Sequence, residues 1–159
     1  MLFIQDQQGE YLPAPQETVF SEAKRLSARH LERGEPIHSA RDAKEAIRFR
    51  LHAHDSEVFA VLFLDAKFRI LAYRQLFRGT VNKATVYPRV VVQVALGLNA
   101  AAVILAHNHP SGDTTPSSDD IALTRKIRDV LGVIDVQVLD HLVVGSEIFS
   151  MADAGQLEL

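Results

Sequence analysis

Two histidines separated by one residue, His107 and His109, follow a buried apolar run and are the side chains best placed to do chemistry. Side chains at positions i and i+2 of an extended chain point to the same side, so both imidazoles can address one point. Pro110 favours extended geometry at His109, because the residue before a proline avoids the α region. Two imidazoles that converge on one point are common ligands of a transition metal. The spacing therefore predicts a metal site at the end of a strand.

A third ligand can come from the start of the helix expected over residues 118–131. Asp119 and Asp120 lie there, after a loop short enough to fold back over the strand end. Helix capping offers an explanation without a metal, because Ser117-x-x-Asp120 resembles a capping signature with an acidic first turn. Both interpretations can hold together, since capping would fix the helix start that presents an aspartate.

Two histidines and one carboxylate leave a coordination position for water, which is the arrangement of a catalytic zinc site. Zinc lowers the pKa of such a water to about 7, and a nearby carboxylate can take its proton as it attacks a carbonyl. Glu57, which opens a buried strand, is the strongest candidate for this base, ahead of Glu147 and Asp113. A hydroxyl of Ser117 or Ser118 could donate a hydrogen bond to the oxyanion that forms.

The elements that must position these residues alternate between two periodicities. Apolar residues at helical spacing predict helices over residues 17–33, 39–54, 88–99 and 118–131. The second helix is expected to begin with Ser39 as its cap and to bury Ala43, Ala46, Ile47 and Leu51. The inward face of the fourth is expected to consist of Leu123, Ile127, Val130 and Leu131. Apolar or alternating runs predict strands over residues 57–65, 67–77, 101–106, 136–144 and 147–150. On the second strand, Ile70, Ala72 and Leu76 are expected to share one face. Residues 79–83 are expected to form a loop, and so are residues 108–116, which begin with Asn108. This order predicts an α/β fold, a mixed sheet covered by helices.

The chain has 159 residues, which favours one domain with a short appendage. Pro13 and Pro15 interrupt regular structure near the start, so we expect residues 1–36 to form a helical appendage to a domain over residues 37–159. No apolar run approaches the roughly 18 residues of a membrane span, and the N-terminus does not read as a secretion signal. We therefore expect a cytoplasmic protein with no membrane partner.

The absence of cysteine excludes disulfide scaffolds, zinc fingers, iron–sulfur clusters and thiol nucleophiles, so histidine and carboxylate must hold any metal. The net charge of −3 argues against a uniformly basic nucleic-acid-binding protein. Residues 41–89 nevertheless carry ten Lys or Arg against five Asp or Glu. This basic half could face an acidic partner, although solvated charges at the edges of helices and strands are the simpler explanation.

The central motif resembles a known family. It reads Ala106-His107-Asn108-His109-Pro110-Ser111-Gly112-Asp113, then Pro116-Ser117 and Asp120, with Glu57 about fifty residues upstream and Asp140-His141-Leu142 downstream. The His-x-His-Pro, Ser-x-x-Asp and upstream glutamate are similar to the JAMM motif of JAB1/MPN metalloprotease domains. Within that superfamily, the longer sequence motif is similar to that of the RadC family of bacterial proteins, and the resemblance extends over residues 37–150.

The resemblance implies a mixed, curved sheet flanked by helices, as in cytidine-deaminase-like proteins. It makes His107, His109 and Asp120 the zinc ligands, Glu57 the general base and Ser117 the oxyanion partner. The implied activity is zinc-dependent hydrolysis of a peptide or isopeptide bond in a peptide or protein substrate. The alternative is a DNA repair or mobile-element adaptor that binds DNA or protein without catalysis, although residues 1–36 lack the helix-hairpin-helix region of longer RadC proteins. His141 is expected to be a buried supporting or core histidine and not a ligand.

Overall fold

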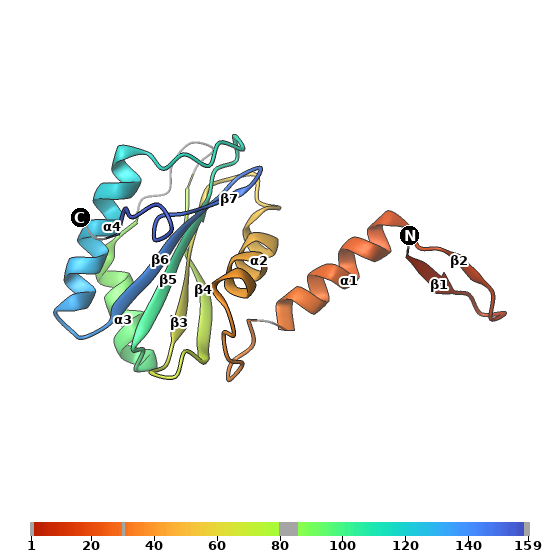
Figure 1. Ribbon diagram of the computed structural model, residues 1–159, viewed down its shortest axis with the longest axis horizontal. Helices are drawn as coiled ribbons and strands as arrows, with labels where there is room; N and C mark the ends of the chain where they lie inside the picture. Colours follow the sequence, from red (N-terminus) through yellow and green to blue (C-terminus); the bar gives the residue numbers. More distant parts are fainter. Residues whose placement is uncertain (1, 30, 80–85, 158–159) are drawn as a thin grey trace.

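A computed structural model describes residues 2–29, 31–79 and 86–157, and it contains a five-stranded mixed sheet (Figure 1). The expected loop over residues 79–83 lies outside the described residues apart from Gly79. The sheet has the order β4-β3-β5-β6-β7. Its strands are β3 (Val58–Leu64), β4 (Ile70–Arg78), β5 (Ala102–Asn108), β6 (Gln137–Val144) and β7 (Ile148–Ser150).

One parallel pair makes this sheet mixed. β5 and β6 are parallel, whereas β3 is antiparallel to both β4 and β5, and β7 is antiparallel to β6. The helix α4 (Ser118–Gly132) connects the two parallel strands, since such strands need a crossover connection. The predicted α/β fold with a mixed sheet is therefore confirmed.

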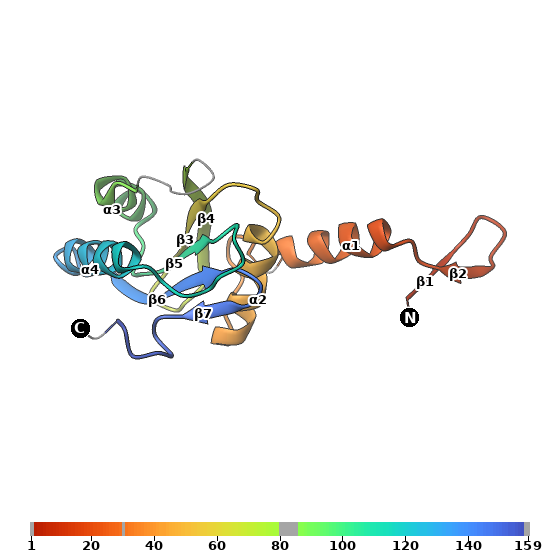
Figure 2. The ribbon, with the colours of Figure 1, turned by 90° about the horizontal axis from the view of Figure 1, so that it is seen from above.

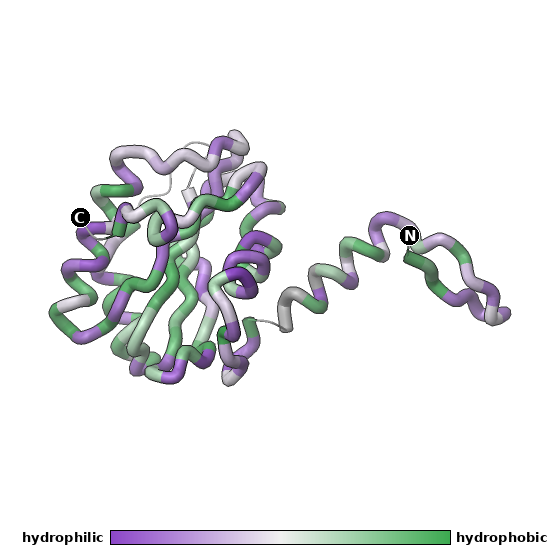
Figure 3. The backbone as a smooth tube through the Cα atoms, viewed as in Figure 1, coloured by the Kyte–Doolittle hydropathy of each residue, from purple (hydrophilic) through white to green (hydrophobic). Residues whose placement is uncertain are grey.

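Helices cover both faces of the sheet (Figure 2). α2 (Ala40–Leu51) packs on one face, and α3 (Pro88–Leu98) lies with α4 on the other. Because β3 is buried on both sides, its side chains alternate between two cores, and every residue of the strand is apolar. Figure 3 shows this arrangement as a hydrophobic central sheet beside more hydrophilic helix surfaces.

Local signals define where the helices begin and end. Ser39 caps α2 by accepting a hydrogen bond from the Asp42 backbone, as the sequence predicts. The predicted stripe of Ala43, Ala46, Ile47 and Leu51 is buried. α3 ends at Asn99, which adopts the left-handed conformation with φ of 53°. α2 ends at Leu51, slightly earlier than the predicted end near His54.

The predicted face of the second strand is wrong for one residue. Leu64 pairs with Ile70, but Phe63 pairs with Ala72, so Leu71 is an extra residue in β4. A bulge of this kind reverses the facing of the residues on its two sides. Ile70 therefore packs on the α2 side of the sheet, while Ala72 packs on the α3 and α4 side.

The inward face of α4 also differs from the expected one. Ile127 and Leu131 are buried as expected, but Val130 is 38% exposed. Thr124 takes a buried position instead, in contact with β6 through a hydrogen bond to His141. The helix is therefore rotated so that a polar side chain faces the sheet close to the predicted site.

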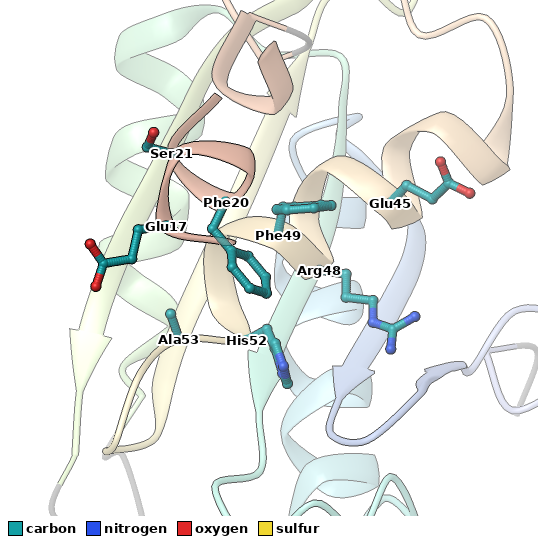
Figure 4. A pocket seen from close by; sticks show the side chains of 8 residues that line it. All are labelled: Glu17, Phe20, Ser21, Glu45, Arg48, Phe49, His52 and Ala53. Atoms are coloured by element: carbon teal, nitrogen blue, oxygen red, sulfur yellow. The ribbon is translucent and has the colours of Figure 1, made fainter. Parts of the chain in front are cut away.

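The N-terminal segment extends away from the sheet in both views (Figures 1 and 2). Besides α1 (Gln16–Arg29) it contains a hairpin of β1 (Phe3–Gln5) and β2 (Tyr11–Pro13), so it is not purely helical as expected. A pocket of about 830 Å³ lies where α1 meets α2. Figure 4 shows its lining, with Phe20 and Phe49 near each other and the guanidinium of Arg48 directed away from them. Among the described ranges, the structure contains no helix able to span a lipid bilayer.

Candidate metal centre

The side chains of His107, His109 and Asp120 meet beyond the end of β5. The Nε2 atoms of the two histidines are 3.0 Å apart. Asp120, in the first turn of α4, places Oδ1 3.4 Å from Nε2 of His107 and Oδ2 3.6 Å from Nε2 of His109. One ligand atom from each residue lies within 4.8 Å of the others. The alternative ligand, Asp119, is exposed and does not belong to this cluster.

A buried chain of hydrogen bonds determines which nitrogen of His107 faces the cluster. The Thr124 hydroxyl donates to the backbone oxygen of Asp120 at 2.6 Å, so it must accept from Nδ1 of His141, at 2.5 Å. Nε2 of His141 then accepts from Nδ1 of His107, at 2.8 Å. The proton positions follow from this donor and acceptor pattern. They leave the lone pair of Nε2 of His107 directed at His109 and Asp120.

His109 is oriented in the same way from the opposite side. Its Nδ1 donates to the backbone oxygen of Asp113 at 2.7 Å, which leaves Nε2 as an acceptor. Two nitrogen lone pairs and a carboxylate thus face one another, and such a group needs a positive charge among its members. A proton on one imidazole can supply that charge, and so can a divalent metal bound to all three. The cluster therefore fits a metal site.

Electrostatics in the metal-free cluster follow from the same contacts. The hydrogen bond with Asp120 raises the pKa of His109, against the opposing effect of burial. Burial raises the pKa of Asp120, but hydrogen bonds from His107, His109 and Ser117 outweigh it and hold that pKa far below its usual range. Asp120 is therefore ionised and available as a ligand at neutral pH.

His141 supports the site and is not part of the cluster. It is fully buried, and burial lowers its pKa well below the usual value, with a further contribution from His107. Both of its ring nitrogens are engaged by His107 and Thr124. The preceding Asp140 accepts hydrogen bonds from the His141 backbone and from Ser150, which fixes the local geometry of β6 and β7.

Ser117 caps α4 and also contacts the carboxylate of Asp120, the candidate metal ligand. Its Oγ accepts from the Asp120 backbone at 3.1 Å and donates to Oδ2 of Asp120 at 2.6 Å, while its own N–H donates to the same oxygen. This capping box confirms the capping interpretation, and it holds in place the aspartate that completes the cluster, so capping is compatible with the metal interpretation. The hydroxyl must turn away from Asp120 before it can donate to an oxyanion.

Glu57 immediately precedes β3 and is half-buried. Phe59 pairs with His107 across the sheet, so continuing this antiparallel register by two residues places Glu57 opposite His109. The negative charge of Glu57 contributes to the raised pKa of His109, which agrees with this proximity. Of the weaker base candidates, Asp113 contacts His109 through its backbone oxygen, but its carboxylate accepts from the Thr115 backbone in the loop. Glu147 is exposed before β7.

Sequence analysis missed two residues that organise the site. Asn108 was expected to open a loop, but it is the buried last residue of β5. Its side chain accepts from the Val58 backbone at 2.7 Å and donates to the backbone oxygens of His54 and Ser56. Thr124 is the second missed residue. It lies four residues after Asp120, so helical spacing could have indicated that both side chains lie on the same face of the helix.

We expect the metal-free protein to lose stability as pH rises above about 6.5, the usual pKa of histidine. The raised pKa of His109 means that protonated His109 stabilises the fold, and this contribution disappears as pH rises through that pKa. His141, with its lowered pKa, is neutral in both folded and unfolded chains in this range. Saturating zinc should abolish the fall, because bound His109 carries no proton. Urea midpoints measured across pH, with and without zinc, check this; equal slopes would contradict it.

A mixed sheet flanked by helices, with a His-His-Asp cluster at a strand end, defines an α/β domain with a cluster that fits a metal site. The chain belongs to the RadC-like JAB domain family, because the sequence model of that family matches residues 37–156. The resemblance inferred from the motif is therefore confirmed. Membership of this family, together with the cluster, is consistent with a metal-dependent hydrolase.

Several bacterial relatives share most of this chain. A UPF0758 protein of Marinobacter nauticus is 50% identical over 134 residues, which cover 84% of this chain and 60% of the relative. A UPF0758 protein of Vibrio cholerae is 46% identical over 139 residues, 87% of this chain and 88% of the relative. A UPF0758 protein of Halorhodospira halophila is 46% identical over 150 residues, which cover 94% of this chain and 67% of the relative. The matched part of the chain thus spans less than two thirds of the length of the Marinobacter protein. The names of these relatives state no activity.

Proposed function

We propose that the protein is a zinc-dependent hydrolase of peptide or isopeptide bonds. The observation that carries the proposal is the convergence of two oriented Nε2 atoms and the Asp120 carboxylate on one point. Two histidines and one carboxylate suit zinc and leave a coordination position open, as in catalytic zinc sites. Membership of the RadC-like JAB domain family supports hydrolysis of an amide bond.

Each residue of the site then has a task. A bound zinc ion would polarise the scissile carbonyl and make water acidic enough to attack it near neutral pH. Glu57, opposite His109 in the register of the sheet, takes the proton of the attacking water and returns it to the leaving amine. Ser117, once its hydroxyl turns from Asp120, donates to the oxyanion. The buried histidine and threonine behind His107 keep its Nε2 directed at the site.

The adaptor alternative stays a prediction. DNA would then bind through the basic half, with Arg41, Arg48 and Arg50 as the residues to test, but these arginines already have contacts within the chain. Arg41 pairs with Glu45, Arg48 donates to the backbone oxygen of Ser146, and Arg50 lies over the ring of Tyr73. These contacts are consistent with the simpler explanation, in which the charged residues of α2 interact with the chain itself and with solvent.

Metal content of the purified chain, prepared without a histidine tag, tests the proposal. We expect about one zinc ion per chain in the wild type, and less than about a tenth of that in His109→Ala, because losing one of three protein ligands removes most of the affinity. Elemental analysis after gel filtration measures both. His38→Ala is the matched control, since His38 is exposed and outside the cluster, and it should keep its zinc. A folded wild type that takes up no added zinc would remove the hydrolase mechanism.

A further inference from the structure

The turn between β6 and β7 lies against the loop that follows His109, at one end of the sheet (Figure 1). Gly145 approaches this loop too closely for any other residue. A Cβ atom at Gly145 would lie 2.4 Å from the backbone oxygen of Gly112, 2.8 Å from its carbonyl carbon and 2.9 Å from Cγ2 of Thr114. Two of these neighbours are backbone atoms, so an alanine at this position would have to displace the loop.

Ser146 holds the same point of the loop. Its backbone N–H and its Oγ both donate to the backbone oxygen of Gly112, at 2.9 and 3.1 Å. Gly112 has a φ of 87°, in the left-handed region that favours glycine. On the other side of the turn, Arg48 of α2 donates to the backbone oxygen of Ser146 at 2.8 Å. The turn is therefore anchored both to the loop and to a helix.

The residue after Gly112 is the one that orients a metal ligand. The backbone oxygen of Asp113 accepts from Nδ1 of His109 at 2.7 Å. The backbone of His109 donates to Val144, the last residue of β6, at 2.8 Å, and Gly112 donates back to the oxygen of His109 at 3.0 Å. Both the main chain and the ring of His109 thus depend on where the β6–β7 turn holds the loop.

We propose that Gly145 and Ser146 are positioning residues that keep His109 in the tautomer with its proton on Nδ1 and its Nε2 lone pair toward the metal. Neither residue belongs to the ligand cluster. They act through the Gly112 carbonyl and the neighbouring Asp113 carbonyl. The inference rests on the metal site of the proposed function and does not depend on hydrolysis.

Zinc affinity and the tautomer of His109 test the inference on the full chain. In Gly145→Ala, we expect the zinc dissociation constant, measured by chelator competition, to rise about 10-fold to 100-fold, as it does when groups that orient a ligand are lost. The second measurement is ¹⁵N NMR of the imidazoles in the metal-free variant at about pH 9, where histidine is neutral. It should show that the ring proton of His109 is no longer confined to Nδ1. Ser146→Ala keeps the backbone donor, so its effects should have the same direction and be smaller.

Gly97→Ala is the matched control, because nothing lies within 4 Å of a Cβ at this helical glycine. Gly97→Ala should leave both the zinc dissociation constant and the tautomer of His109 unchanged. Wild-type affinity and an unchanged tautomer in Gly145→Ala would overturn the inference, as would equal losses in Gly97→Ala. If Gly145→Ala does not fold, the zinc dissociation constant and the His109 tautomer of Ser146→Ala decide the question. A wild type that binds no zinc would overturn the proposed function, whereas the tautomer comparison would still decide this inference.

Discussion

Glu57→Gln is expected to lower kcat/KM for hydrolysis of an isopeptide-linked peptide about 10²-fold to 10⁴-fold, the usual contribution of a general base. The amide of glutamine has nearly the shape of the carboxylate but cannot take a proton from water. Zinc content should stay at the wild-type level, because Glu57 lies outside the ligand cluster. Initial rates with a fluorogenic isopeptide library, together with elemental analysis of the same preparations, measure the two quantities separately.

Glu147→Gln makes the matched control for this experiment. Glu147 is exposed before β7 and was a weaker candidate for the base, and only its backbone oxygen has a described contact, with Gly145. Its activity should equal that of the wild type. Full activity of Glu57→Gln on a substrate that the wild type cleaves would exclude Glu57 as the base, and a loss confined to Glu147→Gln would reassign that role.

Thr124→Val should cost both stability and metal affinity. Valine has nearly the volume of threonine, but it removes the hydroxyl and so leaves Nδ1 of His141 without its partner in a buried place. We expect the free energy of unfolding to fall by about 1–3 kcal/mol, the cost of unsatisfied buried polar groups. Since His141 then no longer holds Nδ1 of His107 in one protonation pattern, zinc affinity should fall about 10-fold to 100-fold.

Thr124→Ser separates the hydroxyl from the packing of this side chain. Serine keeps the Oγ that joins His141 to Asp120, so zinc affinity should return close to the wild-type value even if the lost methyl group lowers stability. Urea unfolding of the metal-free proteins and chelator competition give the two numbers. Wild-type zinc affinity in Thr124→Val would show that the hydrogen-bond chain does not orient His107.

Features encoded by neighbouring residues could be predicted from the sequence. The cap at Ser39, the helix end at Asn99 and the shared direction of His107 and His109 each depend on a few adjacent positions. The same holds for Ser117 and Asp120, whose capping contacts span a single turn. Local stereochemistry was therefore enough to locate the two histidines and the helix start that faces them, whereas the choice of Asp120 over Asp119 came from the family resemblance.

Features that depend on pairing between distant segments could not be predicted. The bulge at Leu71 arises from the register between β3 and β4, so alternation along one strand gave the wrong face for Ile70. Asn108 belongs to β5 because β6 pairs with it there. The burial of Thr124 depends on where β6 lies under α4, and the close approach at Gly145 depends on a loop some thirty residues earlier in the sequence.

The parallel pair β5 and β6, joined by α4, carries the whole ligand cluster and the histidine behind it, whereas Glu57 precedes β3 on a separate stretch of chain. The proposed metal binding and the proposed proton transfer can therefore diverge independently during evolution. Under the proposed function, a single substitution at position 57 would turn an enzyme into a metal-binding protein without a base. Sorting homologous chains by the residue at that position would separate the two kinds before any assay.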